Sequence, residues 1–269
     1  MSPSPHFWRP PALPFFEGRR ATGSLSCYAP HTHDSFSIGI VDDGHSIFTL
    51  AGRREAISPG DVILVQAGDV HCCNPADLQR WSYRMFHLDT SWLTSLLAQN
   101  LATCGLPGGM PSQVVRSPEA LQWLDRMTYA LENGHPDLES EVTRCLQHVM
   151  RACADACPPK QASEAAEDDG LQRAHDFLLA HCRDRVSLAT LAELAGTSRY
   201  QLIRQFRRRF GLTPHALQLD MKIRQARTLL QQGASTVHAA LDTGFADQSH
   251  FHRAFKSRVA ATPLQYRRA

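Results

Sequence analysis

Residues 240–256 read ALDTGFADQSHFHRAFK, and this stretch decides the fold of the C-terminal half of the chain. It lies across two helical segments. The first begins at Thr236 and ends at a turn that contains Gly244, and the second begins at Asp247, which is a good N-cap residue. Two short helices joined by a tight turn with glycine have the spacing of a helix-turn-helix unit. The stretch therefore predicts such a unit near the C-terminus.

The same pattern occurs a second time, 49 residues earlier in the chain. In this earlier copy Ser187 can cap the first helix, Gly196 supplies the turn, and Ser198 can cap a second helix that ends at Gly211. The offset pairs Leu202 with Phe251, Arg204 with Arg253, Phe206 with Phe255, Thr213 with Thr262, and Pro214 with Pro263.

Residues 214–232 lie between the two copies and are long enough for one helix of roughly 28 Å. Such a helix would hold two DNA-reading units about one turn of DNA apart. The sequence thus predicts two helix-turn-helix units that reach adjacent major grooves.

Charge divides the chain near residue 170. Residues 171–269 carry 16 Lys and Arg against 6 Asp and Glu, a net charge of +10, whereas residues 1–170 carry 12 against 20, a net charge of −8. A basic surface attracts a polyanion and gives salt-dependent affinity through counterion release. Charge alone is also compatible with a solvated basic face, but charge and repeat together favour DNA over a plain helical bundle.

We expect the apolar side chains of the second helix in each copy to face the core. In the first copy these are Leu202, Phe206 and Phe210. The opposite face is then free to enter the major groove, where Arg can form two hydrogen bonds to guanine and further arginines neutralise phosphates. The predicted DNA-contacting residues are Arg199, Tyr200, Ile203, Arg204, Arg207, Arg208, Ser249, His250, Arg253 and Lys256.

Residues 171–268 resemble the DNA-binding domain of AraC/XylS-type transcription regulators, most specifically in residues 240–256 and in the Thr262, Pro263 and Tyr266 that follow. The resemblance implies that the base-facing positions are Tyr200, Ile203 and Arg204 in the first copy and Ser249, His250 and Arg253 in the second. It also implies double-stranded DNA and RNA polymerase as partners, and a homodimer. Ala260 stands where glycine is usual, so we expect the second reader helix to end with a different cap.

Residues 24–90 alternate short apolar stretches with turns rich in Gly, Pro and Asp, which predicts an antiparallel barrel or sandwich. The apolar stretches are residues 37–41, 46–50, 62–65 and 81–88. From Ser91 to Cys157 the apolar period becomes helical. The apolar stripes of residues 121–131 and 142–150 can close the barrel or pair with a second subunit, and the family resemblance favours pairing.

The predicted fold class is therefore α+β, with a β-barrel and accessory helices followed by an all-α domain. We expect residues 1–157 to form an effector-binding and dimerisation domain, in which the barrel spans about 20–90 and the helices about 91–157. Small and polar residues 158–170 form a linker. Residues 171–269 form the DNA-binding domain.

His31 and His33 form a His-x-His pair, and His71 follows turns at Gly60 and Gly68. This arrangement resembles a cupin barrel, although Gln66 replaces the usual Pro and Ser37 and Ile38 stand where a metal-binding cupin supplies Glu. The two histidines of the pair point to the same side of a strand, so with His71, and with His87 as a further candidate, they can form a site of three or four nitrogen ligands for a divalent metal. Alternatively, His31, His33, His71 and His87 line a pocket for an organic effector.

The missing carboxylate favours the effector pocket. We therefore expect a sequence-specific transcription regulator that responds to a small molecule and is not an enzyme, and the family resemblance favours an activator over a repressor. Three alternatives stay open: a metal-dependent cupin enzyme fused to a DNA-binding domain, a metal or thiol sensor that uses Cys72 and Cys73, and a DNA-architectural protein without an effector. The last predicts a barrel without a cavity.

The sequence also bears on location. It contains no apolar run of the roughly 18 to 20 residues that cross a bilayer, and its N-terminus lacks the order of a signal peptide. We expect a cytoplasmic protein without a membrane partner, whose eight cysteines are reduced thiols.

Overall fold

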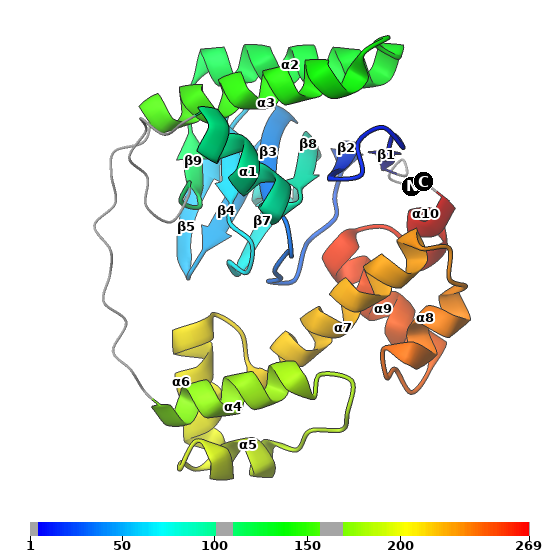
Figure 1. Ribbon diagram of the computed structural model, residues 1–269. Helices are drawn as coiled ribbons and strands as arrows, with labels where there is room; N and C mark the ends of the chain where they lie inside the picture. Colours follow the sequence, from blue (N-terminus) through cyan, green and yellow to red (C-terminus); the bar gives the residue numbers. More distant parts are fainter. Residues whose placement is uncertain (1–4, 101–109, 157–168, 269) are drawn as a thin grey trace.

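The computed structural model describes residues 5–100, 110–156 and 169–268. Strands and three helices come first, and the remaining helices follow (Figure 1). The strands are β1 (His6–Trp8), β2 (Phe16–Ser24), β3 (Phe36–Asp43), β4 (Ser46–Leu50), β5 (Arg53–Ile57), β6 (Val62–Val65), β7 (His71–Pro75), β8 (Trp81–Leu88) and β9 (Gln113–Val115). The helices are α1 (Thr90–Asn100), α2 (Pro118–Asn133), α3 (Leu138–Asp155), α4 (Asp169–Ala180), α5 (Leu188–Leu194), α6 (Arg199–Phe210), α7 (Pro214–Gln231), α8 (Thr236–Asp242), α9 (Gln248–Val259) and α10 (Pro263–Arg268).

The strands form two antiparallel sheets. The larger has the order β1-β2-β8-β3-β6-β9 and the smaller the order β5-β4-β7. The four apolar stretches predicted as strands are β3, β4, β6 and β8. The sheet region begins earlier than the predicted residue 20, because β1 ends at Trp8 and β2 begins at Phe16. It also gains β9 from a segment expected to be helical.

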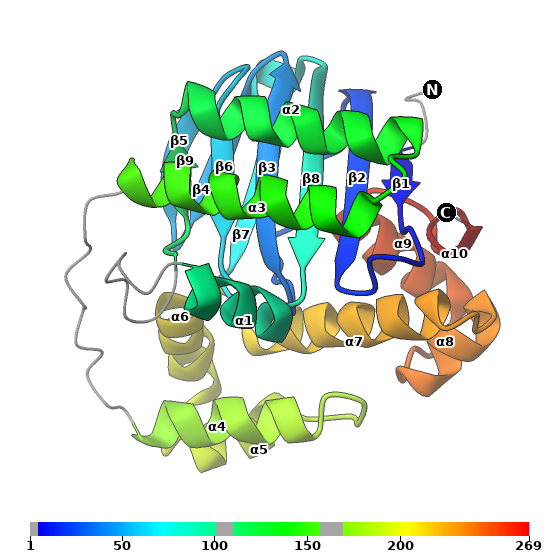
Figure 2. The same cartoon turned by 45° about the horizontal axis from the view of Figure 1, so that its top comes forward.

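The larger sheet has a core on each face, which follows from the alternation of side chains along each strand. On one face Ile38, Ile40 and Phe86 pack with Leu124 and Leu146 of the covering helices. Helices α2 and α3 lie across this face of the sheet (Figure 2). On the other face a second core fills the space between the two sheets. It contains Val41, Ile63, Trp81 and Tyr83 of the larger sheet and Phe48, Ile57 and Cys73 of the smaller sheet.

The apolar stripes of α2 and α3 close this domain rather than pairing with another subunit. Leu124, Met127, Val142, Leu146 and Val149 have no exposed area. The prediction that these stripes form a dimer contact is therefore wrong, because the sheet of the same chain already covers them. The exposed side of α2 presents Tyr129, which is 69% exposed.

Both helix-turn-helix units form as the sequence predicts. Ser187 caps α5, Ser198 caps α6 in a capping box with Gln201, and Asp247 caps α9. We call α6 and α9 the reader helices. Leu202 and Phe206, together with Phe251 and Phe255 of α9, are buried as expected, whereas Phe210 is only half-buried and stacks on His175 at 4.3 Å between ring centroids.

One continuous helix, α7, joins the two units, and each unit has a core of its own. The linker predicted at residues 158–170 lies almost entirely outside the described residues. Asp169 and Gly170 already belong to α4.

The expected change of cap at Ala260 does not occur. Ala260 adopts the left-handed conformation with φ 50°, as Gly211 does at the end of α6 with φ 74°. Its backbone N–H donates a hydrogen bond to the carbonyl oxygen of Lys256. A side chain in this region is sterically strained, so α9 ends with the same geometry at a higher conformational cost.

We expect Ala260→Gly to raise the free energy of unfolding by up to about 1 kcal/mol, because glycine adopts positive φ without strain. Gly196→Ala is the matched reverse change: Gly196 has φ 63° with nothing within 4 Å of an added Cβ. It should lower the free energy of unfolding by about 1 kcal/mol. Chemical denaturation of both variants measures the difference, and a destabilised Ala260→Gly variant contradicts the assignment of strain.

Candidate effector pocket and DNA-reading surfaces

A cavity of about 50 Å³ lies where the inter-sheet space meets the C-terminal helices. Most of its wall comes from the strands and the loop before β3, and the rest from α7 and α9. The lining residues are Phe7, Glu17, Arg19, Tyr28, His31, His33, His71, Cys73, Trp81, Tyr83, Met85 and His87 from the N-terminal part, and Arg227, Arg258 and Val259 from the C-terminal part.

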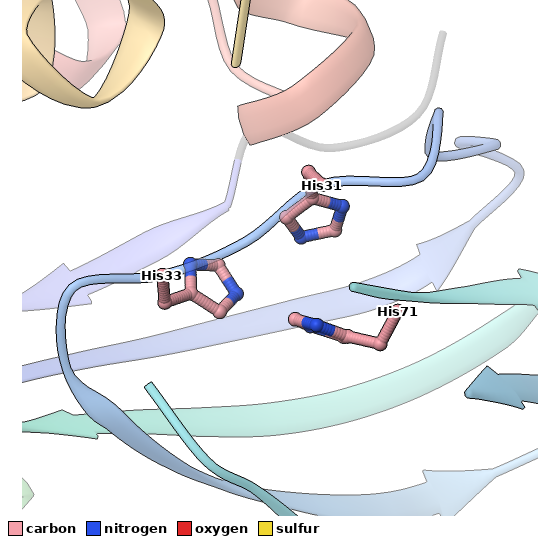
Figure 3. A group of neighbouring side chains, drawn as sticks. All are labelled: His31, His33 and His71. Atoms are coloured by element: carbon pink, nitrogen blue, oxygen red, sulfur yellow. The ribbon is translucent and has the colours of Figure 1, made fainter. Parts of the chain in front are cut away.

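The structure brings all four predicted histidines to this cavity. His31 and His71 exchange backbone hydrogen bonds of 3.0 and 3.1 Å, so their rings lie side by side, 4.6 Å apart between centroids. The ring centroid of His33 lies 4.9 Å from that of His71 and 4.5 Å from that of His87. Figure 3 shows His31 and His33 on the segment before β3, facing His71. No member of the group is more than 8% exposed.

Burial favours the neutral form of all four imidazoles. Burial lowers the pKa of His31 and His33 well below the ordinary value, lowers that of His71, and lowers that of His87 to about 3. Neighbouring histidines and Arg227 add to the effect at His33 and His31. A neutral imidazole has one donor and one acceptor, so the group can bind a polar ligand or a metal.

The geometry of three of these histidines fits a metal. One ligand atom each from His31, His33 and His71 lies within 4.8 Å of the others. Nδ1 of His31 and Nδ1 of His71 each lie 2.9 Å from a backbone carbonyl oxygen, of Ala29 and Asp69 respectively. A carbonyl oxygen only accepts, so both Nδ1 atoms donate and both Nε2 atoms keep a lone pair, as in many metal sites.

The surrounding charges oppose a metal. Arg227 Nη1 lies 3.4 Å from Nδ1 of His33, and a guanidinium only donates, so His33 carries its proton on Nε2 in this arrangement. Arg227 and Arg258 both disfavour positive charge on His31. Ser37 stands where a metal-binding cupin has a carboxylate, and its hydroxyl forms a 2.8 Å hydrogen bond with Nδ1 of His87. The donor set thus fits an organic ligand better than a cation.

The two cysteines next to His71 lie on different sides of β7. Cys73 lines the cavity, whereas Cys72 accepts a hydrogen bond from Asn74 Nδ2 at 3.7 Å. Burial raises the pKa of Cys72, and that of Cys73 to about 12, which disfavours the reactive thiolate. Among the described cysteines, Cys27, Cys72, Cys73, Cys145 and Cys182 are free thiols.

A buried carboxylate joins the two halves of the chain beside the cavity. Glu17 of β2 accepts hydrogen bonds from Arg9 Nε at 2.8 Å, Arg227 Nη2 at 2.9 Å, Gln231 Nε2 at 2.6 Å and the Tyr266 hydroxyl at 2.7 Å. Burial raises the pKa of a carboxyl group, but Arg227, His87 and Arg9 outweigh it and hold the pKa of Glu17 at about 2.

A second contact lies on the segment that carries the histidines. Asp220 of α7 accepts hydrogen bonds from the backbone N–H of Thr32 at 3.1 Å and from its hydroxyl at 2.6 Å. Arg224 donates to the Thr32 hydroxyl at 3.1 Å and pairs with Asp34. Burial raises the pKa of Asp220 to about 6, although Thr32 and Arg258 act in the opposite direction. Helix α7 thus packs directly against the residues around the cavity.

The predicted DNA-contacting residues lie on the reader helices with at least part of each side chain exposed. Ile203 and His250 are half-buried, and Tyr200 is 78% exposed. The exposed members are Arg199, Tyr200, Arg204, Arg207, Arg208, Ser249, Arg253 and Lys256. Helices α6 and α9 come from different units, and α7 and α8 lie between them in the chain (Figure 1).

Sequence reasoning missed the arginines of the cavity wall. Arg258 shares the buried face of α9 with Phe251 and Phe255, so a charged residue at an apolar position was the signal that could have revealed it. Arg19 and Arg227 lie in a strand and a helix whose partners are distant in sequence, and no local pattern marks them.

Two family models match the chain. An AraC-like ligand binding domain matches residues 13–149, and a helix-turn-helix domain matches residues 191–269. An uncharacterized HTH-type transcriptional regulator of Bacillus subtilis, YbfI, is 28% identical over 87% of this chain and 85% of its own length. The transcriptional activator RhaS of Escherichia fergusonii is 25% identical over 89% of this chain and 87% of its own.

The fold is also found among solved structures. The crystal structure of ToxT from Vibrio cholerae O395 matches with a TM-score of 0.58 and 13% identity, over 94% of this chain and 97% of that chain. Among the described residues, no helix has the length and apolar character that crossing a membrane requires.

These features define a DNA-binding transcription regulator with an N-terminal ligand-binding domain and a helix-turn-helix domain. The chain belongs to the AraC family of such regulators. The family resemblance and the α+β fold class predicted from the sequence are confirmed.

We expect the reader arginines to separate into two groups. Arg204→Ala and Arg253→Ala should each lose roughly 1 to 3 kcal/mol of binding free energy on the cognate site and relax preference at one base pair. Arg208→Ala, further along α6, should weaken binding to any duplex and reduce the salt dependence. Binding measured on cognate and scrambled duplexes at two salt concentrations tests this. An equal loss on both duplexes for all three variants contradicts the assignment of base-reading residues.

Proposed function

We propose that this chain is a transcription activator whose small-molecule effector binds in the cavity lined by His31, His33, His71 and His87. The observation that carries the proposal is the composition of the cavity wall: Arg227 and Arg258 of the DNA-binding domain face the histidines of the barrel. A ligand in this cavity touches both domains. Its binding energy therefore depends on how the two domains dock, which is the requirement for allosteric control.

Helix α7 transmits the change in docking. It joins the two helix-turn-helix units and also carries Asp220, Arg224 and Arg227, which contact the barrel. A change in the packing of α7 against the barrel alters the position of one reader helix relative to the other. Since two readers must meet adjacent grooves at a fixed separation, the effector controls DNA affinity through this geometry.

The remaining partners are inferred from the family and from surface features. Helix α8 presents Val237, which is 48% exposed, and Leu241, which is 66% exposed, beside the second reader. Such apolar side chains suit a contact with RNA polymerase bound on neighbouring DNA. We propose a cytoplasmic homodimer that has no catalytic activity, whose dimer contact uses a surface other than the buried stripes of α2 and α3.

Selection from a random duplex library with the full chain tests the function. We expect enrichment of a motif with two contacted blocks about one helical turn apart. A reporter gene placed downstream of that motif should then rise when the chain is expressed. Salt-sensitive retention without enrichment contradicts sequence-specific binding, and a falling reporter signal contradicts activation.

The geometry of His31, His33 and His71 supports a second candidate, a metal-dependent cupin enzyme or metal sensor. If the guanidinium charges exclude a cation, protein incubated with zinc and then desalted should hold far less than one equivalent of metal. Elemental analysis measures this, with His71→Gln as the control for metal bound elsewhere. One equivalent that disappears in His71→Gln favours the metal site over our proposal.

A further inference from the structure

The wall of the cavity contains buried hydrogen-bond donors that have no acceptor. Within the described ranges, four buried side-chain polar atoms have no hydrogen-bond partner, and all four are nitrogen donors. Three of them, Arg19 Nε, Trp81 Nε1 and Arg258 Nε, belong to residues that line the cavity. Buried donors without acceptors are costly and rare in folded proteins. The three residues thus call for a ligand that brings acceptors.

The charge of Arg258 is poorly compensated. Its only carboxylate neighbour in the described part of the chain is Asp220, 3.5 Å from Nε, and Asp220 already accepts two hydrogen bonds from Thr32. Arg258 is 8% exposed, and its other hydrogen bonds, to Ala254 and Ser257, are long at 3.4 to 3.5 Å. Burial of an arginine without a close anion is unfavourable.

Arg19 has no ion pair with any carboxylate that the structure describes. Its Nη1 donates to the carbonyl of Val259 at 2.5 Å, and its guanidinium lies 5.6 to 5.8 Å from the ring centres of Phe7, Tyr28 and Tyr83. Arg227, by contrast, is neutralised by Glu17 at 2.9 Å. Of the three cavity arginines, Arg19 thus has no carboxylate partner among the described residues, and Arg258 has only Asp220 at 3.5 Å.

The rest of the wall defines the body of the ligand. Phe7, Trp81, Tyr83 and Met85 supply apolar surface, and a cavity of about 50 Å³ admits only a small molecule unless its wall moves. Guanidinium groups bind carboxylates through paired, charge-assisted hydrogen bonds.

We propose that the effector is a small organic carboxylate whose oxygens accept hydrogen bonds from Arg258, Arg19 and Trp81. This inference rests on the proposed function, because it names the chemical class of that effector. It also gives the effector a direct route to the DNA. Arg258 belongs to the reader helix α9, and Arg19 donates a hydrogen bond to the carbonyl of Val259 at the end of the same helix. A carboxylate that binds both arginines therefore links the second reader helix to the barrel.

Matched acid and amide pairs test the proposal on the full chain. The probes are acetate with acetamide, benzoate with benzamide, and hexanoate with hexanamide, titrated while the Tm is recorded. We expect at least one acid to raise the Tm with an apparent affinity at least tenfold above that of its amide, because the amide lacks the charge. Phosphate and sulfate are run in parallel, and stabilisation by these alone contradicts an organic ligand.

Arg258→Gln should abolish the preference for acid over amide. Arg268→Gln is the matched control: it removes the same charge from an exposed position on α10 and should leave the preference unchanged. If Arg258→Gln does not fold, Arg258→Lys serves instead, and it should keep the preference with an affinity for the acid about tenfold lower.

The proposal is overturned if no acid binds more tightly than its amide, or if Arg258→Gln keeps the preference. In either case the proposed function is tested separately by the DNA selection and the reporter gene, because those experiments use neither the acid and amide probes nor the Arg258 variants.

Discussion

The docking of the two domains depends on one buried carboxylate, that of Glu17. It binds Arg9 of the N-terminal segment, Arg227 and Gln231 of α7, and Tyr266 of α10. Removing one partner of a buried ion pair typically costs several kcal/mol, since the remaining charge is left without compensation. The N-terminal segment, β2, α7 and α10 are therefore held in one arrangement, and both the cavity and the reader helices take their positions from it.

This arrangement explains why a cavity of a barrel can control DNA binding. Arg227 pairs with Glu17 and also contacts His33, so the same side chain belongs to the docking contact and to the cavity wall. Gly211, at the end of the first reader helix, lies against Val70 of the loop before β7. Both helix-turn-helix units thus touch the barrel. A ligand that favours one docked state over another acts on both readers.

Local sequence patterns predicted the elements whose partners lie close along the chain or share one face. The caps Ser198 and Asp247 and the buried Leu202 and Phe206 follow from helical periodicity, and β3, β4, β6 and β8 follow from apolar runs. Strand β5 escaped prediction because most of its residues are exposed and charged or small. The apolar face of α3 was predicted correctly, but it was assigned to a second subunit instead of the sheet. An apolar pattern indicates that a helix face is buried, but it does not indicate which surface buries it.

The sequence by itself determined that this chain has two DNA-reading units of one repeated pattern, a histidine-bearing β domain before them, and opposite charge on the two halves. These properties depend on residues within one or two turns, or on composition, and local physics decides them. Only the tertiary structure decided that four histidines meet Arg227 and Arg258 in one cavity, that Glu17 joins the two domains, and that Ala260 keeps the left-handed end of α9. Contacts such as that between Glu17 and Tyr266 cross 249 residues, and they arise from packing that no local pattern encodes.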